Sequence, residues 1–174
     1  MPTRWSCLLS LRLFLDTEFT DLLHCELLSV GIVAEDGREF YAERSDVDMS
    51  LCGDFCRLAV VPQLGAEPSA IGTESEIAAR LKCWLAQFQA NAPVVVSVDH
   101  PTDWELFTHL ARDDETLKVP NWITGQSIRA AIDPRNIEAY WELHGRRAHH
   151  ALHDAKALRF AWQRDQSVRT ASAG

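Results

Sequence analysis

A short apolar run near the start of the chain ends in two acidic residues, and this feature constrains the fold most. Residues 13–15 are all apolar, and Asp16 and Glu18 follow them with one residue in between. Residues two apart in a β-strand point to the same face, so both carboxylates would project side by side from the end of a strand. Such carboxylates repel each other unless a hard divalent cation neutralises them. The pattern therefore predicts a central strand that ends in a metal site.

The spacing alone is weak evidence, because Asp-x-Glu also occurs at Asp103/Glu105 and Asp113/Glu115. Only the first copy follows an uninterrupted apolar segment. The interpretation therefore depends on acidic partners further along the chain.

Length and composition predict one α/β domain. With 174 residues, 47% of them hydrophobic, the chain can bury a core of ordinary size. We expect a tail over residues 1–11, the domain over 12–165 and a second tail over 166–174. The net charge of −8 argues against a broad basic surface that coats nucleic acid. It is compatible with an enzyme that grips a strand end, because bound metal ions supply positive charge locally.

The cysteines and the apolar start predict a cytoplasmic protein without a membrane partner. The five cysteines are scattered, and only Cys52 and Cys56 lie close in sequence. Without a second pair, buried and reduced thiols are the simplest interpretation. Arg12 interrupts the apolar start, which favours a tail and a strand over a secretion signal. No stretch has the length needed to cross a membrane.

The order of predicted elements alternates strands with helices. Asp36-Gly37 predicts a hairpin between two strands, and Thr73 with Glu76 forms a capping box that starts a helix. After the first strand we expect strands over 26–34, 39–42, 94–98 and 122–128, and helices over 73–91, 104–111, 135–143 and 151–164, with a short helix near 52–60.

Further acidic residues follow the later elements. Asp103 comes shortly after the strand 94–98, and Asp99 is a competing carboxylate in the same stretch. If this strand neighbours the first one, Asp103 lies beside Asp16. Both then lie in the crevice at the carboxyl ends of the strands, where open α/β sheets usually have their active sites. His149 precedes the last helix, and Asp154 lies one turn inside it, so both can face that crevice.

Three segments in this order resemble the motifs of the DEDDh family of 3′–5′ exonucleases. Residues 14–19 resemble the first motif, residues 96–107 the second, and His149 with Asp154 and Ala155 the third. The resemblance implies a ribonuclease-H-like fold, with a mixed five-stranded sheet flanked by helices in a single domain. Because the chain is small and has no Thr-Gly after Glu18, it looks most like the small bacterial exoribonucleases of the mycobacterial type.

The family resemblance also implies a set of residue roles. Asp16 would bridge two Mg²⁺ or Mn²⁺ ions, Glu18 and Asp154 would complete the shell of the first ion, and Asp103 would hold the second. His149 would accept the proton of the attacking water.

The same resemblance implies that the substrate is the 3′ end of single-stranded or overhanging RNA, or else DNA. Thr17, Phe19 and His149 would contact it. A homodimer is also implied.

Three other functions remain open at this stage. One is a 3′–5′ exodeoxyribonuclease of the proofreading type, since sequence motifs do not show contacts to the 2′-OH. The second is a zinc-dependent hydrolase that uses His149, His150, His153 and Asp154. The third is a nucleic-acid-binding module without catalysis. For the second motif we favour Asp103 over Asp99, because a helix is expected to begin at that point.

Overall fold

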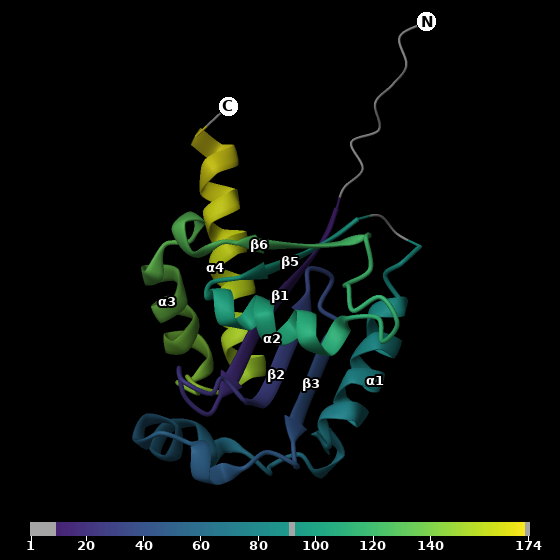
Figure 1. Ribbon diagram of the computed structural model, residues 1–174. Helices are drawn as coiled ribbons and strands as arrows, with labels where there is room; N and C mark the ends of the chain where they lie inside the picture. Colours follow the sequence, from purple (N-terminus) through teal and green to yellow (C-terminus); the bar gives the residue numbers. More distant parts are fainter. Residues whose placement is uncertain (1–9, 91–92, 173–174) are drawn as a thin grey trace, which may run out of the picture.

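A single mixed sheet of six strands forms the centre of the protein. The computed structural model describes residues 10–90 and 93–172 (Figure 1). The strand order is β4-β3-β2-β1-β5-β6, and the strands are β1 (Leu11–Phe19), β2 (Leu27–Ala34), β3 (Glu39–Arg44), β4 (Ile71–Gly72), β5 (Val94–Val98) and β6 (Ile123–Ser127). The acidic strand β1 is therefore central, as predicted.

The pairing of β1 brings the predicted motifs to one edge of the sheet. β1 runs antiparallel to β2, with Asp16 opposite Gly31, and parallel to β5, with Leu13 opposite Val96. Because β1 and β5 are parallel neighbours, their carboxyl ends meet at the same edge. The predicted five strands are all present. The sixth, β4, has only two residues and pairs with β3, so no periodicity in the sequence could reveal it.

Helices cover both faces of the sheet. The main core lies between the sheet and the pair α1 (Glu74–Ala86) and α2 (Pro101–Ala111), and it takes Leu13 and Leu15 from β1. Phe14 points to the other face, where α4 (Ala151–Ser172) packs with α3 (Pro134–His144) beside it (Figure 1). The acidic pair at positions 16 and 18 continues this second face.

Three helices differ from the predicted ranges. α1 ends at Ala86, five residues before the expected end at 91. α2 begins at Pro101, three residues before the expected Trp104, and the side chain of His100 caps it. Asp103 thus lies inside the first turn and does not cap the helix. α4 continues to Ser172, past the expected end at Arg164 and through most of the segment predicted to be a tail.

The region between β3 and α1 contains short turns. A 3₁₀ turn (Met49–Leu51), a π-helical turn (Cys56–Val60) and a second 3₁₀ turn (Val61–Gln63) follow one another. Cys52 and Cys56 are free and buried, as expected, whereas Cys83 is free but exposed on α1. Cys7 lies outside the described residues.

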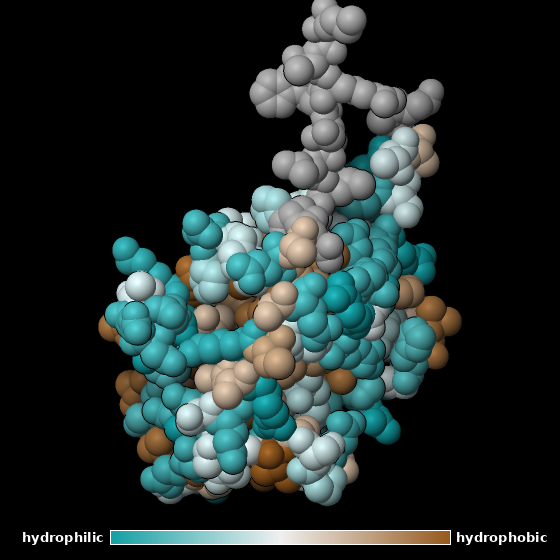
Figure 2. All heavy atoms as spheres, turned by 90° about the vertical axis from the view of Figure 1, so that its right-hand side faces the viewer, coloured by the Kyte–Doolittle hydropathy of each residue, from teal (hydrophilic) through white to brown (hydrophobic). Residues whose placement is uncertain are grey.

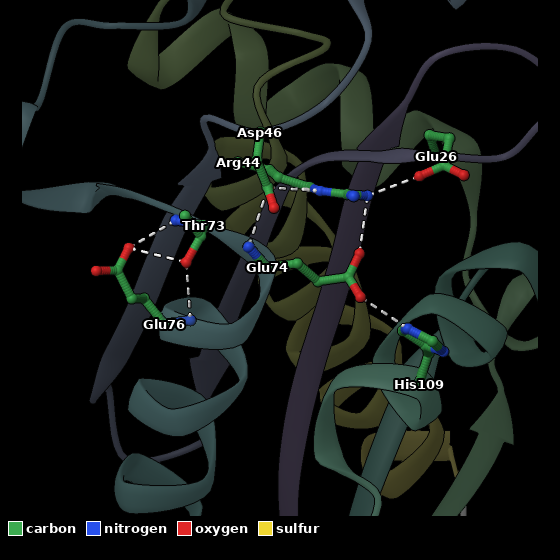
Figure 3. Close-up of polar contacts among 7 residues, drawn as sticks. All are labelled: Glu26, Arg44, Asp46, Thr73, Glu74, Glu76 and His109. Atoms are coloured by element: carbon green, nitrogen blue, oxygen red, sulfur yellow. Dashed lines mark hydrogen bonds and ion pairs between the residues drawn. The ribbon is translucent and has the colours of Figure 1, made fainter.

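A polar network fixes α1 and α2 near the edge where β1 ends (Figure 3). The guanidinium of Arg44 contacts Glu26, Asp46 and Glu74 at 2.7–2.9 Å, and His109 of α2 contacts Glu74 at 2.9 Å. Thr73 and Glu76 form the predicted capping box beside it.

The side of the molecule that carries α1 is mostly hydrophilic, with small separate apolar areas (Figure 2). Within the described part of the chain, no helix is long and apolar enough to cross a membrane.

Candidate active site

Five carboxylates gather at the carboxyl ends of β1 and β5. Asp16, Glu18 and Asp154 have carboxylate oxygens within 4.8 Å of one another, and so do Asp16, Asp99 and Asp103. Asp16 belongs to both groups and therefore lies at the centre. The carboxylates line an open cleft of about 400 Å³.

Strand alternation and a hydrogen bond to the backbone of β1 place these side chains. Asp16 and Glu18 point to the α4 face, while Thr17 points to the α2 face. Thr17 donates both its N–H and its hydroxyl to Oδ1 of Asp103, at 3.1 and 2.7 Å. Asp103, 2% exposed, is thereby held against the end of β1 although it comes from α2.

Burial and mutual repulsion raise the pKa values of four of these acids. Loss of solvation is the main cause, and the neighbouring carboxylates add to it. The pKa of Asp16 lies well above its usual range, and the pKa of Glu18 rises to about 8. The pKa values of Asp103 and Asp154 each rise to about 7. Of the described residues that line the cleft, none is Lys or Arg, so a bound cation is the natural partner for these charges.

The residues present fit a hard divalent cation. Every carboxylate in the cleft offers oxygen, the ligand that Mg²⁺ and Mn²⁺ prefer. Oδ2 of Asp103 is buried and has no hydrogen-bond partner within the described structure. A buried carboxylate oxygen without a partner is costly, and an ion bound between Asp103 and Asp16 would satisfy it.

The third motif lies beside the cleft because the first turn of α4 packs closely against β2. A Cβ on Gly31 would overlap backbone atoms of Ala151 and Leu152, so only glycine lets the first turn of α4 approach the sheet this closely. Asp154 lies in that turn. The backbone N–H groups of His149 and His150 donate to its Oδ2, at 2.7 and 3.0 Å.

His149 lies at the lip of the same cleft, before α4 begins. It is exposed, lines the cleft, and has a positive φ of 68°. Its ring meets the ring of Phe55 edge-on, with the centroids 4.8 Å apart. An exposed imidazole beside a group of carboxylates is suited to accept a proton from a water molecule in the cleft.

Comparison with known proteins finds two similar relatives. Two 3′–5′ exoribonucleases, from two strains of Mycobacterium tuberculosis, are each 27% identical to this chain over 157 residues, which cover 84% of this chain and 88% of the relative. The chain is similar to mycobacterial 3′–5′ exoribonucleases. This confirms the resemblance inferred from the three motifs and supports a hydrolase of the 3′–5′ exonuclease class. No family model matches the chain.

A solved structure of exonuclease I supports the fold. It matches with a TM-score of 0.54 and 15% identity, over 86% of this chain and 39% of exonuclease I. The chain thus spans well under half the length of that protein. The match confirms the predicted α/β class with a mixed sheet between helices.

The structure brings together all the site residues that the exonuclease resemblance implies. Asp16, Glu18, Asp103, His149 and Asp154 line one cleft, as do Thr17 and Phe19.

Asp99 joins the same cleft, so the structure contains both candidates for the acid of the second motif. The sequence did not single out His100, Ile137 and Leu158, which also line the cleft. It did not single out Phe55 either, whose ring contacts that of His149 and which lies in the region without periodicity, where no motif marks it.

Proposed function

We propose that this protein is a divalent-metal-dependent 3′–5′ exoribonuclease. One observation carries the proposal: two overlapping carboxylate groups share Asp16 in a cleft that His149 borders. The names of the mycobacterial relatives support RNA as the substrate.

In this proposal the acids hold two ions, Mg²⁺ or Mn²⁺. Asp16 would contact both, because it belongs to both carboxylate groups. Glu18 and Asp154 would complete one site, and Asp103 the other. When bound, such ions make water a stronger nucleophile and stabilise the charge that develops on the phosphate and the leaving oxygen.

The remaining residues orient the reactants. His149 would take the proton from the attacking water, the general-base role that histidine most often has in enzymes. Thr17 keeps Asp103 in place through two hydrogen bonds and borders the cleft together with Phe19. We propose that Thr17, Phe19 and His149 also contact the terminal nucleotide.

The zinc-hydrolase alternative finds no support in the geometry. Among the described residues, neither of the two groups that could hold a metal ion includes a histidine. Nδ1 of His150 is buried, and its ring packs against the rings of Tyr41 and His153. A non-catalytic module would keep the buried acids at a cost in stability with no compensating role.

Product analysis tests the proposal. Matched 5′-labelled RNA and DNA oligonucleotides are incubated with the protein and Mn²⁺, Mg²⁺ or EDTA. We expect stepwise shortening of RNA from its 3′ end, faster than of DNA, with no reaction in EDTA. Internal fragments as first products, or activity that persists in EDTA, would contradict it. Light scattering of the same sample tests the homodimer that the family resemblance implies.

A further inference from the structure

A strap formed by residues 53–65 crosses from the end of β1 to the entry of α4. At its start, the N–H of Gly53 donates to the carbonyl oxygen of Thr20, at 3.1 Å. At its end, the N–H of Gly65 donates to Oε2 of Glu43, at 2.6 Å. Between these points, Cys56 and Val60 are buried in a small apolar cluster with Leu28 of β2. The strap is therefore fixed to the sheet at both ends and in the middle.

One side chain of the strap reaches the loop that carries His149. Nε2 of Gln63 lies 2.8 Å from the carbonyl oxygen of Ala148 and 2.9 Å from that of His149. It also lies 2.9 Å from the carbonyl oxygen of Ala59, within the strap itself. The amide of Gln63 thus joins the strap to two successive carbonyl groups of the loop.

The loop needs such support. His149 has a φ of 68°, in the left-handed region that residues other than glycine rarely adopt. Its N–H, with that of His150, already donates to Asp154. The N–H groups of the loop are therefore held by a proposed metal ligand and its carbonyl groups by Gln63. Together these contacts fix the point from which the imidazole of His149 projects over the acids.

We propose that Gln63 is a positioning residue that keeps His149 aligned for proton transfer. This inference rests on the proposed exonuclease function and adds a residue to it. The hydrogen bonds of Gln63 to the loop go to backbone carbonyl oxygens, so we expect its effect on the reaction to pass through the loop. Phe55 touches the ring of His149 directly, but it is 62% exposed at the lip of the cleft and also accessible to substrate. Gln63 therefore gives the cleaner test.

The test is a double-mutant cycle with Gln63→Leu, His149→Ala and the combined variant, all assayed on 5′-labelled RNA at saturating Mn²⁺. Because a misplacement of about 1 Å can cost roughly 10²-fold in rate, we expect Gln63→Leu to lower kcat by about 10- to 100-fold. In the His149→Ala background, Gln63→Leu should cause no further loss, since the group that it aligns is gone. KM and Mn²⁺ affinity, measured by calorimetry, should stay within about twofold of the wild type.

Gln89→Leu is the matched control, because Gln89 is exposed beyond the end of α1. Its kcat should equal that of the wild type. Gln63→Glu keeps the side-chain length but removes the N–H donors, and it gives the same cycle if Gln63→Leu fails to fold. Circular dichroism confirms the fold of each variant.

Three results would overturn the inference: an unchanged kcat in Gln63→Leu, losses that multiply in the combined variant, or a fall in Mn²⁺ affinity. The last result would mean that Gln63 merely stabilises the entry of α4, which also carries Asp154. These results leave the proposed function intact as long as the wild type shortens RNA. A wild type that degrades neither RNA nor DNA would overturn the proposed function, and this inference with it.

Discussion

Replacing Asp103 by asparagine should stabilise the metal-free protein, and the gain should grow as pH rises. Asparagine keeps an oxygen that can accept the two hydrogen bonds from Thr17. It removes one of the negative charges that crowd the cleft. The structure therefore predicts that a proposed metal ligand lowers the stability of the apo protein.

The magnitude follows from the pKa of Asp103, which burial and the nearby Asp99 raise to about 7. In the unfolded chain the same group has a pKa near 3.9. Below that value the carboxyl is protonated in both states and carries no penalty. As pH rises towards 7, the unfolded state releases its proton first, so the wild type loses stability. At about 1.4 kcal/mol per pH unit, the loss between pH 5 and pH 8 is roughly 2–3 kcal/mol.

Urea unfolding in EDTA at pH 5, 6, 7 and 8 measures this loss. The free energy of unfolding of Asp103→Asn, minus that of the wild type, should increase by roughly 2–3 kcal/mol between pH 5 and pH 8. Any constant cost of the buried amide cancels in this comparison. Glu105→Gln is the control, because Glu105 is exposed on the same helix, and its difference from the wild type should stay flat. Saturating Mn²⁺ should stabilise Asp103→Asn less than the wild type, because the variant loses a ligand of only one of the two proposed ions.

The reasoning would be refuted if the difference in free energy of unfolding between Asp103→Asn and the wild type did not change with pH. It would also be refuted if the wild type gained stability over the variant between pH 5 and pH 8. Either result would mean that Asp103 is not held as a repelled, buried acid.

Three further predictions concern activity and packing. Gly31→Ala should force α4 away from β2, lowering the free energy of unfolding by about 1–3 kcal/mol in urea titrations and slowing RNA hydrolysis. His149→Ala should keep Mn²⁺ affinity in calorimetry but lose roughly 10²–10⁴-fold in kcat, whereas His150→Ala should be milder; loss of Mn²⁺ binding would contradict the assigned role. In parallel kinetics, Asp103→Asn should lose more activity than Asp99→Asn, and the reverse ranking would move the second-motif acid to position 99.

The sequence was informative where residue pattern and chemistry coincide. The apolar run before Asp16 predicted the central strand, and the strand period of two correctly put Glu18 on the same face. The β-branched run Val94–Val98 predicted a buried strand, which is β5. The order of the three motifs then led to the set of acids that the structure collects in one cleft.

Features that depend on tertiary contacts could not be predicted. Gly31 looks like an ordinary strand residue, and its importance comes from α4, more than a hundred residues later in the chain. The region from 45 to 72 has no periodicity, because its short turns are fixed by contacts to Thr20, Glu43 and the loop at 148–149. The contribution of Gln63 to the site was therefore hidden.

The start of α2 was placed too late for a different reason. Pro101 is a favoured first residue of a helix, and the side chain of His100 caps the helix in front of it. Asp103 is a residue type that favours the N-cap position, so it moved the predicted start of the helix to position 104.

The most direct test of the central claim is an anomalous difference map from crystals of the protein soaked in Mn²⁺. The account predicts peaks between the carboxylates of the cleft, with Asp16 a ligand in common and Glu18, Asp103 and Asp154 completing the shells. The same soak of Asp16→Asn crystals should leave the cleft without a strong peak. Strong Mn²⁺ peaks only on other parts of the molecule, or peaks in the cleft that persist undiminished in Asp16→Asn, would contradict the account.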